Sequence, residues 1–291
     1  MQRLKGRVAI VTGASRGGGR GIARVLGEEG ATVYVTGRTS REGARGADGT
    51  GTIEETAEWV SAAGGVGIPV RCDHTTDAEV EALFCRVREE QGRLDLLVNN
   101  VWGGYEGYAE VSFTAPFWEQ PLWRWDRMFA AGVRAHFSAL RLAAPLMIIQ
   151  GRGLVVHTTF WDRSKYLSNL PYDVAKAAVN RLAHGAAVEL RPHGIAVVAL
   201  SPGWMRTEAV LRHLGATEET WQSVPELAST ESPQYLGRAV AALAGDPRVL
   251  EKSGCTLTVG DLAQEYGFSD VDGRVIPAFR IPIREEPLPR S

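Results

Sequence analysis

The chain has 291 residues, of which 44% are hydrophobic, enough for one large domain with a sizeable core. Its 34 acidic and 32 basic side chains give a net charge of −2 and form no block of like charge, which argues against nucleic acid or an anionic membrane as a partner. The start of the chain leaves no room for a secretory signal before the first strand, and no apolar run reaches the roughly 18 residues of a membrane span. We therefore expect a cytoplasmic protein with a small-molecule partner.

Short β-branched runs alternate with longer helical patterns along the chain. The predicted strands span residues 8–11, 32–35, 67–70, 94–98, 154–156, 195–200 and 255–259. The predicted helices span residues 17–27, 53–63, 77–90, 123–149 and 172–190. This order predicts βαβ units, and hence an α/β fold with a three-layer, Rossmann-like, doubly wound parallel sheet. We expect a single domain over residues 1–291, with a core at about 6–260 and an extension at 261–291 whose prolines (277, 282, 287 and 289) exclude regular helix.

A glycine-rich turn lies between the first strand and the first helix. It contains Gly13, Ser15, Arg16, Gly17, Gly18 and Gly19. Strand, turn and helix in this order bring backbone N–H groups and a helix N-terminus to the pyrophosphate of a dinucleotide, and glycine is needed because a Cβ would block the approach. We predict a cofactor-binding loop; a glycine turn without a ligand is the alternative.

The second strand ends in Arg38 and Thr39, without the carboxylate that holds the ribose 2′-OH of NAD. An arginine at this place suits a 2′-phosphate, and Arg16 adds a second cation. We therefore favour NADP(H) over NAD(H). The alternative is that Arg38 is a solvated loop residue.

Tyr172 and Lys176 lie four residues apart in a predicted helix and so share one face. A tyrosine gives up its proton poorly at neutral pH unless a cation within about 4–6 Å favours the phenolate. Lys176 is placed to supply that charge. The pair therefore predicts proton transfer to or from a carbonyl or alcohol oxygen, with a core tyrosine and an exposed lysine as the alternative.

In these motifs the chain resembles the short-chain dehydrogenase/reductase family. The resemblance covers about residues 6–260 and also includes Asp73 after the third strand, Asn99-Asn100 after the fourth, and Pro202-Gly203 with Thr207 after the sixth. It implies that Tyr172 is the acid/base, that Lys176 also holds the nicotinamide ribose, that Asp73 and Asn100 lie near the adenosine, and that residues 202–207 surround the carboxamide. It also suggests a homodimer or homotetramer built on the two long helices.

Within the family, short strings resemble the dehydrogenase/reductase member 1 type. These strings are Trp118-Glu119-Gln120-Pro121, Trp125-Asp126, Asp261-Leu262-Ala263, Tyr266-Gly267 and Asp270-Val271-Asp272-Gly273.

Several positions depart from the family pattern. In the family, a serine about 13 residues before the tyrosine polarises the substrate carbonyl. That position falls on Thr159 here, or on Phe160 if the spacing differs by one residue. Ser164 is only eight residues before Tyr172, which is too near to take this role. The family asparagine that anchors a proton-relay water falls near Gly132. Asn99-Asn100 is followed by the bulkier Val101-Trp102. We predict Thr159 as the hydroxyl donor.

Three tryptophans, Trp102, Trp161 and Trp204, follow the fourth, fifth and sixth strands. They could line an apolar substrate pocket, or serve ordinary packing or a subunit interface. The prediction is an oxidoreductase that transfers hydride between NADP(H) and a hydrophobic carbonyl or alcohol. The alternative is a catalytically weak sensor of NADP(H). The three scattered cysteines (Cys72, Cys85 and Cys255) predict buried thiols without disulfides, and the histidines, including His74 and His157, lack metal-ligand spacing, so we predict no metal.

Overall fold

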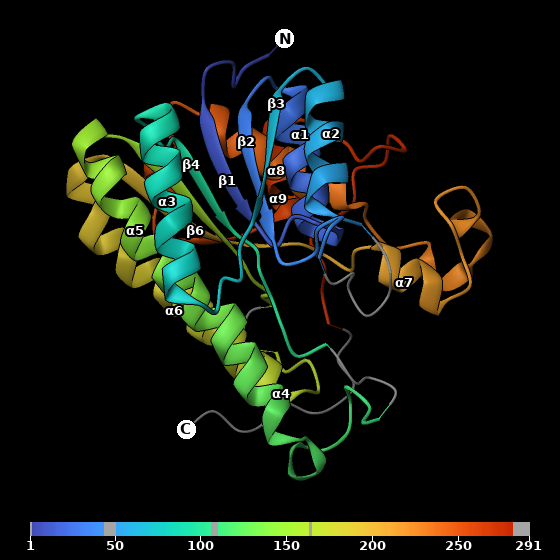
Figure 1. Ribbon diagram of the computed structural model, residues 1–291. Coiled ribbons are helices and arrows are strands. Elements are labelled where there is room, and N and C mark those ends of the chain that lie inside the picture. Colours follow the sequence, from blue (N-terminus) through green and yellow to red (C-terminus); the bar gives the residue numbers. More distant parts are fainter. Residues whose placement is uncertain (1, 44–50, 106–109, 163–164, 282–291) are drawn as a thin grey trace.

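The computed structural model describes residues 2–43, 51–105, 110–162 and 165–281. Its centre is a seven-stranded parallel sheet in the order β3-β2-β1-β4-β5-β6-β7 (Figure 1). The strands are β1 (Val8–Thr12), β2 (Thr32–Gly37), β3 (Val66–Arg71), β4 (Leu96–Asn99), β5 (Gly153–Thr158), β6 (Ile195–Ser201) and β7 (Thr256–Thr258). The order reverses direction between β1 and β4, where open sheets of this kind bind ligands. The predicted fold class is confirmed.

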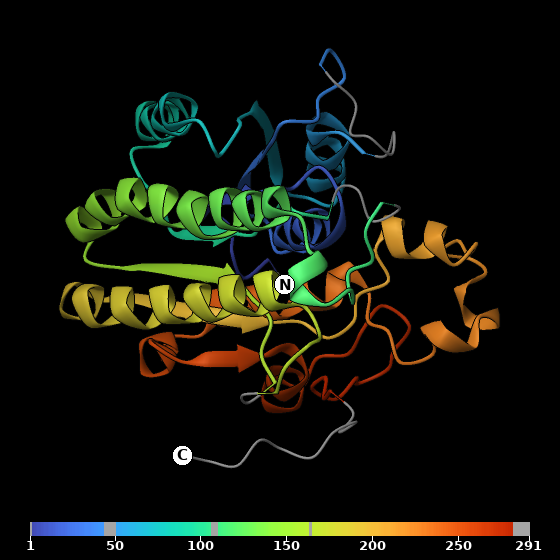
Figure 2. The same cartoon turned by 90° about the horizontal axis from the view of Figure 1, so that it is seen from below.

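Helices cover both faces of the sheet (Figures 1 and 2). One face packs against α1 (Gly17–Glu28), α2 (Ile53–Ala62), α8 (Pro233–Gly245) and α9 (Val259–Tyr266). The other packs against α3 (Asp77–Gln91), α5 (Ala135–Gln150) and α6 (Leu170–Leu190), and α5 and α6 run side by side in Figure 2. Alternate residues of the buried strands point to opposite faces, which gives two hydrophobic cores, one on each side.

The predicted helix over 123–149 is continuous in space but not uniform. It begins as α4 (Leu122–Arg127), passes through the π-helical segment η2 (Met128–Arg134) and continues as α5 to its left-handed cap at Gly151. Single π-helical turns occur often at functional sites. Here the π turn contains Gly132, one of the positions that depart from the family pattern.

The region after β6 holds three helices that were not predicted: α7 (Glu208–His213), α8 and α9. Nine of the thirteen residues of α8 are buried, so its sequence has few of the polar positions by which a surface helix is recognised. Residues 261–281 pack against the rest of the domain; Ile276, for example, belongs to the core beside α8. The prediction of three buried thiols is wrong for Cys85 and Cys255, which are exposed. Residues 44–50, Ser164 and the prolines beyond residue 281 lie outside the described residues.

Candidate active site

The conformation of the glycine loop is fixed by close backbone contacts and by hydrogen bonds to residues at the end of β4. Gly13 has a φ of 65°, and a Cβ there would lie 2.8 Å from the Cα of Val101. A Cβ at Gly19 would lie 2.3 Å from the Gly13 carbonyl oxygen. The amide of Asn100 donates to the carbonyls of Thr12 (3.0 Å) and Gly13 (3.2 Å), while the Thr12 hydroxyl accepts the Asn100 backbone N–H at 2.8 Å. These contacts join the loop to the end of β4.

An anionic group of the protein itself lies at the N-terminus of α1. The Glu208 carboxylate accepts the backbone N–H of Gly17 at 2.9 Å and lies 3.5 Å from the guanidinium of Arg20. A helix N-terminus favours such an anion through its free N–H groups and its dipole. The Glu208 contact shows that this helix N-terminus accepts an anion, as binding of a dinucleotide pyrophosphate would require. Arg16 is the N-cap residue of the same helix.

The end of β2 carries the residues predicted to select the cofactor. Arg38 is well exposed, and its guanidinium lies 3.9 Å from the carboxylate of Asp73 at the end of β3. Ser15, in the glycine loop, and Thr39, the residue after Arg38, are both buried. Arg38 and Asp73 are thus neighbours in the structure, although 35 residues separate them in the chain.

The first turn of α6 positions the predicted acid/base. Asn169 is fully buried; its side-chain oxygen accepts the backbone N–H of Tyr172 at 2.9 Å, and its amide donates to the Phe113 carbonyl at 2.6 Å. An N-cap of this kind fixes where the helix begins. Tyr172 is 8% exposed and Lys176 is 7% exposed, so the alternative of an exposed lysine does not hold.

The Lys176 ammonium faces Trp102. It lies 3.6 Å from the centre of the indole ring and 3.5 Å from the Thr158 carbonyl oxygen. Burial lowers the pKa of Lys176 to about 7, because the charged form loses its hydration. A cation over an indole face is stabilised by the ring quadrupole, which offsets part of that loss.

Trp102 also explains the glycine at position 132. A Cβ on Gly132 would lie 2.2 Å from the ring of Trp102, so any side chain there would collide with the indole. The tryptophan fills the place where the family pattern expects an asparagine. Trp102 further packs edge-on against Tyr172, with 5.5 Å between ring centres.

Thr159 lies close to the pair, and its hydroxyl faces backbone carbonyls. It is buried, and its hydroxyl can donate to the carbonyl oxygen of Lys176 at 3.3 Å or to that of Phe160 at 3.5 Å. The neighbouring Thr158 donates to the Asn99 carbonyl at 3.4 Å. Phe160, the alternative position, packs on the Tyr172 ring at 6.1 Å and has no donor.

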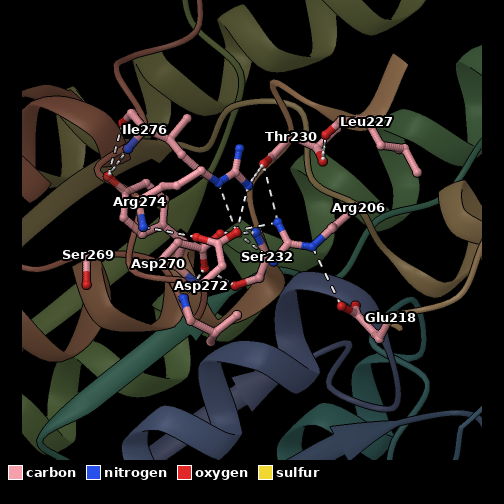
Figure 3. Close-up of polar contacts among 12 residues, drawn as sticks. Arg206, Glu218, Leu227, Thr230, Ser232, Ser269, Asp270, Asp272, Arg274 and Ile276 are labelled. Atoms are coloured by element: carbon pink, nitrogen blue, oxygen red, sulfur yellow. Dashed lines mark hydrogen bonds and ion pairs between the residues drawn. The ribbon is translucent and has the colours of Figure 1, made fainter. Parts of the chain in front are cut away.

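The segment after β6 passes beside the glycine loop and is held by a buried ionic cluster (Figure 3). A Cβ on Gly17 would lie 3.5 Å from the Thr207 methyl, which places residues 202–207 at the loop. Arg206, 1% exposed, lies 3.3 Å from Asp270 and 3.6 Å from both Asp272 and Glu218.

Glu231 is buried close to this cluster. Burial raises its pKa to about 8, although the N–H of Gly203 favours the charged form. The backbone of Glu231 pairs with residues 204–206, so it holds the segment from its other side.

Three buried histidines lie beneath the site. His136 and His157 face each other through their Nδ1 atoms at 3.4 Å, and His74 contacts the Thr36 hydroxyl at 2.8 Å. Burial lowers the pKa of His74 to about 4 and that of His157 to about 3, so both are neutral at pH 7. In the part of the chain that the structure describes, no group of three or more His, Cys, Asp or Glu side chains could hold a metal ion.

The structure therefore gathers the predicted residues at one sheet edge. It also adds three residues that the sequence analysis missed: Asn169, Glu208 and Glu231. Asn169 carried a recognisable signal, since an asparagine two residues before Pro171 is a typical helix start. The other two act through contacts between distant segments, which no local pattern reveals.

Comparison with known proteins identifies the family. Residues 7–216 match the family model described as short chain dehydrogenase. The chain belongs to the short-chain dehydrogenase/reductase family. It is 42% identical over 281 residues to the human protein named dehydrogenase/reductase SDR family member 1, covering 94% of this chain and 86% of that protein, which confirms the finer resemblance.

Two solved structures of the family are also similar. A 7α-hydroxysteroid dehydrogenase in complex with NADH and 7-oxo glycochenodeoxycholic acid is 28% identical, with a TM-score of 0.70 over 88% of this chain and 94% of that one. A metagenomic short-chain oxidoreductase in complex with NADP is 28% identical, with a TM-score of 0.65 over 88% and 96%. The chain is an oxidoreductase of a family that uses NAD(P)(H) and acts on CH–OH groups of small molecules.

Proposed function

We propose that this protein transfers hydride between NADP(H) and a hydrophobic carbonyl or alcohol, with Tyr172 as the acid/base. The observation that carries the proposal is the buried pair at the start of α6: a tyrosine inside an aromatic cluster, with a lysine ammonium 5.5 Å from its ring centre. A site that only sensed the cofactor would have no use for such a proton donor.

The nicotinamide, when bound, supplies the hydride that forms the new C–H bond at the carbonyl carbon. Tyr172 gives its hydroxyl proton to the carbonyl oxygen, and the Lys176 ammonium stabilises the phenolate that remains. In the oxidation direction the same groups act in reverse. With the cofactor bound, Lys176 would also hold the nicotinamide ribose, Asp73 and Asn100 would lie near the adenosine, and residues 202–207 would surround the carboxamide.

An apolar substrate is supported by the side chains around Tyr172. The ring centres of Trp102 and Phe113 each lie 5.5 Å from that of Tyr172. The ring of Phe160 packs against that of Phe279 in the C-terminal segment, with 5.9 Å between centres. Aromatic side chains that line a pocket in this way favour flat or hydrophobic substrates. Trp204 is 42% exposed, which leaves its part in the pocket a prediction.

The cofactor preference rests on Arg38 at the end of β2, where no carboxylate follows to bind a ribose 2′-OH. Arg38→Asp should weaken NADPH binding by roughly tenfold to a hundredfold while NADH binding changes little, because a charge-assisted contact to the 2′-phosphate is lost. Titration of both cofactors by intrinsic fluorescence tests this, with Arg41→Asp as the matched control. Equal weakening of the two cofactors would contradict the preference.

The exposed side of η2, α5 and α6 supports self-association. A groove of about 770 Å³ runs between the helices, lined by Phe129, Val133, Phe137, Leu182 and neighbouring residues, and Phe137 is half exposed. We propose a homodimer or homotetramer built on this face. We also place the protein in the reducing cytoplasm, in line with its three free cysteines. Among the described residues, no helix is both long enough and apolar enough to span a bilayer.

A further inference from the structure

The indole ring of Trp102 covers the ammonium of Lys176. Trp102 lies in the segment after β4, and the ammonium is 3.6 Å from the centre of its ring. An ammonium has three N–H groups to donate. Among the described residues, its one hydrogen-bond acceptor is the Thr158 carbonyl oxygen, at the long distance of 3.5 Å, and no described carboxylate forms an ion pair with it. The negative face of the indole is therefore the main group that stabilises this charge.

The ionisable groups around the ammonium carry no charge that could replace the ring. Burial lowers the pKa of His136 in α5 well below its usual range and that of His157 in β5 to about 3, so both are neutral at pH 7. Tyr105 packs against Trp102 with 6.3 Å between ring centres, and burial raises its pKa well above the usual value. The ring centre of Tyr172 lies 5.5 Å from the ammonium.

The position of the indole is fixed by its other contacts. A Cβ on Gly132 of η2 would lie 2.2 Å from Cζ3 and 2.5 Å from Cε3 of Trp102, so the ring fits only because position 132 is a glycine. Trp102 also packs edge-on against Tyr172, with 5.5 Å between ring centres. One side chain thus contacts both members of the Tyr172 and Lys176 pair, and it fills the space in which the family pattern has an asparagine.

We propose that Trp102 is a positioning residue for proton transfer: its indole face holds the Lys176 ammonium beside Tyr172, in place of the family asparagine and its water. This inference rests on the proposed function. Trp102 exchanges no proton and makes no bond to the substrate. It acts by favouring the charged form of Lys176 at pH values where burial alone would discharge it. Trp102 and Gly132 are then two parts of one change, because the ring that holds the ammonium needs the glycine to make room for it.

The first test follows the ionisation of Lys176 and needs no substrate. The chain has four lysines (Lys5, Lys165, Lys176 and Lys252). Lysine labelled with 13C at Cε therefore gives few NMR signals, and Lys176→Arg identifies the one to follow. Trp102→Leu should move its titration to lower pH by about one unit, the size expected for a cation–π contact away from water. Trp102→Phe keeps a smaller aromatic face and should move it less. Trp118→Leu, at a well exposed tryptophan, should leave it in place.

Fluorinated tryptophan separates the charge distribution of the ring from its shape. Incorporation of 5-fluorotryptophan, and then of 5,7-difluorotryptophan, withdraws electrons from the indole face with little change in its size. Each analogue should move the Lys176 titration further to lower pH in the wild type, and neither should move it in Trp102→Leu. The fluorinated wild type keeps its side chains in place, so it decides the question even if circular dichroism shows that Trp102→Leu does not fold.

Activity gives a second readout. The fall of kcat/KM with pH, measured for reduction of 4-nitrobenzaldehyde by NADPH, should begin about one pH unit lower in Trp102→Leu, and Trp102→Phe should recover part of this shift. A Lys176 titration that fluorination leaves in place, or that moves to higher pH in Trp102→Leu, would show that the ring only fills space and would overturn the proposal. Full activity of Tyr172→Phe would instead overturn the proposed function, and the titration would still judge Trp102.

Discussion

The cofactor side and the substrate side of the sheet edge are shaped in different ways, the first mainly by backbone geometry and the second by aromatic side chains. On the cofactor side, the loop after β1 is shaped by positive φ angles and by contacts too close for a Cβ, and it is tied to the next strand by Thr12 and Asn100. On the substrate side, Tyr172 is surrounded by rings from the segments after β4 and β5, and one of these rings, Phe160, packs in turn against Phe279 of the C-terminal segment. Backbone geometry leaves a motif in the sequence, whereas side chains that meet from distant segments do not.

The largest effect that would sharpen this comparison is expected at Arg206. Its removal leaves the buried carboxylate of Asp270 without its cation, so Arg206→Ala should lower the free energy of unfolding by about 3–5 kcal/mol. Urea denaturation measures this. Arg248→Ala, in an exposed pair, is the control and should stay within about 0.5 kcal/mol.

The same variant links the cofactor site to this cluster. The cluster holds residues 202–207, which we propose contact the nicotinamide carboxamide, so folded Arg206→Ala should bind NADPH more weakly than the wild type. An NADPH Kd equal to that of the wild type would contradict this link.

A smaller effect, on the pH profile, is expected at Lys176. Because burial lowers its pKa to about 7, the ammonium is present below pH 7 and is lost above it. The value of kcat/KM for reduction, which reports the free enzyme, should therefore fall about tenfold per pH unit above 7. Lys176→Arg keeps a charge at all these pH values, so its profile should fall only at higher pH, whatever its absolute rate.

The control for this profile is Lys252→Arg, which alters an exposed pair with Glu265 and should reproduce the wild-type curve. A wild-type profile that stays flat through pH 7, or one that Lys176→Arg does not move, would remove Lys176 from the account of proton transfer.

The sequence predicted all seven strands and five of the helical regions to within a few residues, because alternation of buried strands and amphipathic helices is a local signal. It missed α8, most of whose residues are buried, and it missed the π turn at Gly132. Trp102 explains the glycine in that turn, because its ring occupies the space of any side chain at position 132. The sequence shows both residues but not that they touch.

The candidate site shows the same limit. Spacing alone located Tyr172 and Lys176, because four residues on a helix define their geometry. Spacing also selected Thr159, but it could not show that the Thr159 hydroxyl faces backbone carbonyls. Tyr105 lies 67 positions before Tyr172, and only the folded chain stacks their rings, with 6.3 Å between centres.

The most direct test of the central claim is hydride transfer in a single turnover by Tyr172→Phe. With enzyme in excess, NADPH bound and 4-nitrobenzaldehyde added, the variant should bind NADPH as the wild type does. It should oxidise the cofactor about 10²- to 10⁴-fold more slowly, because the proton donor is gone. A Tyr172→Phe variant that oxidises NADPH at the wild-type rate would contradict the account.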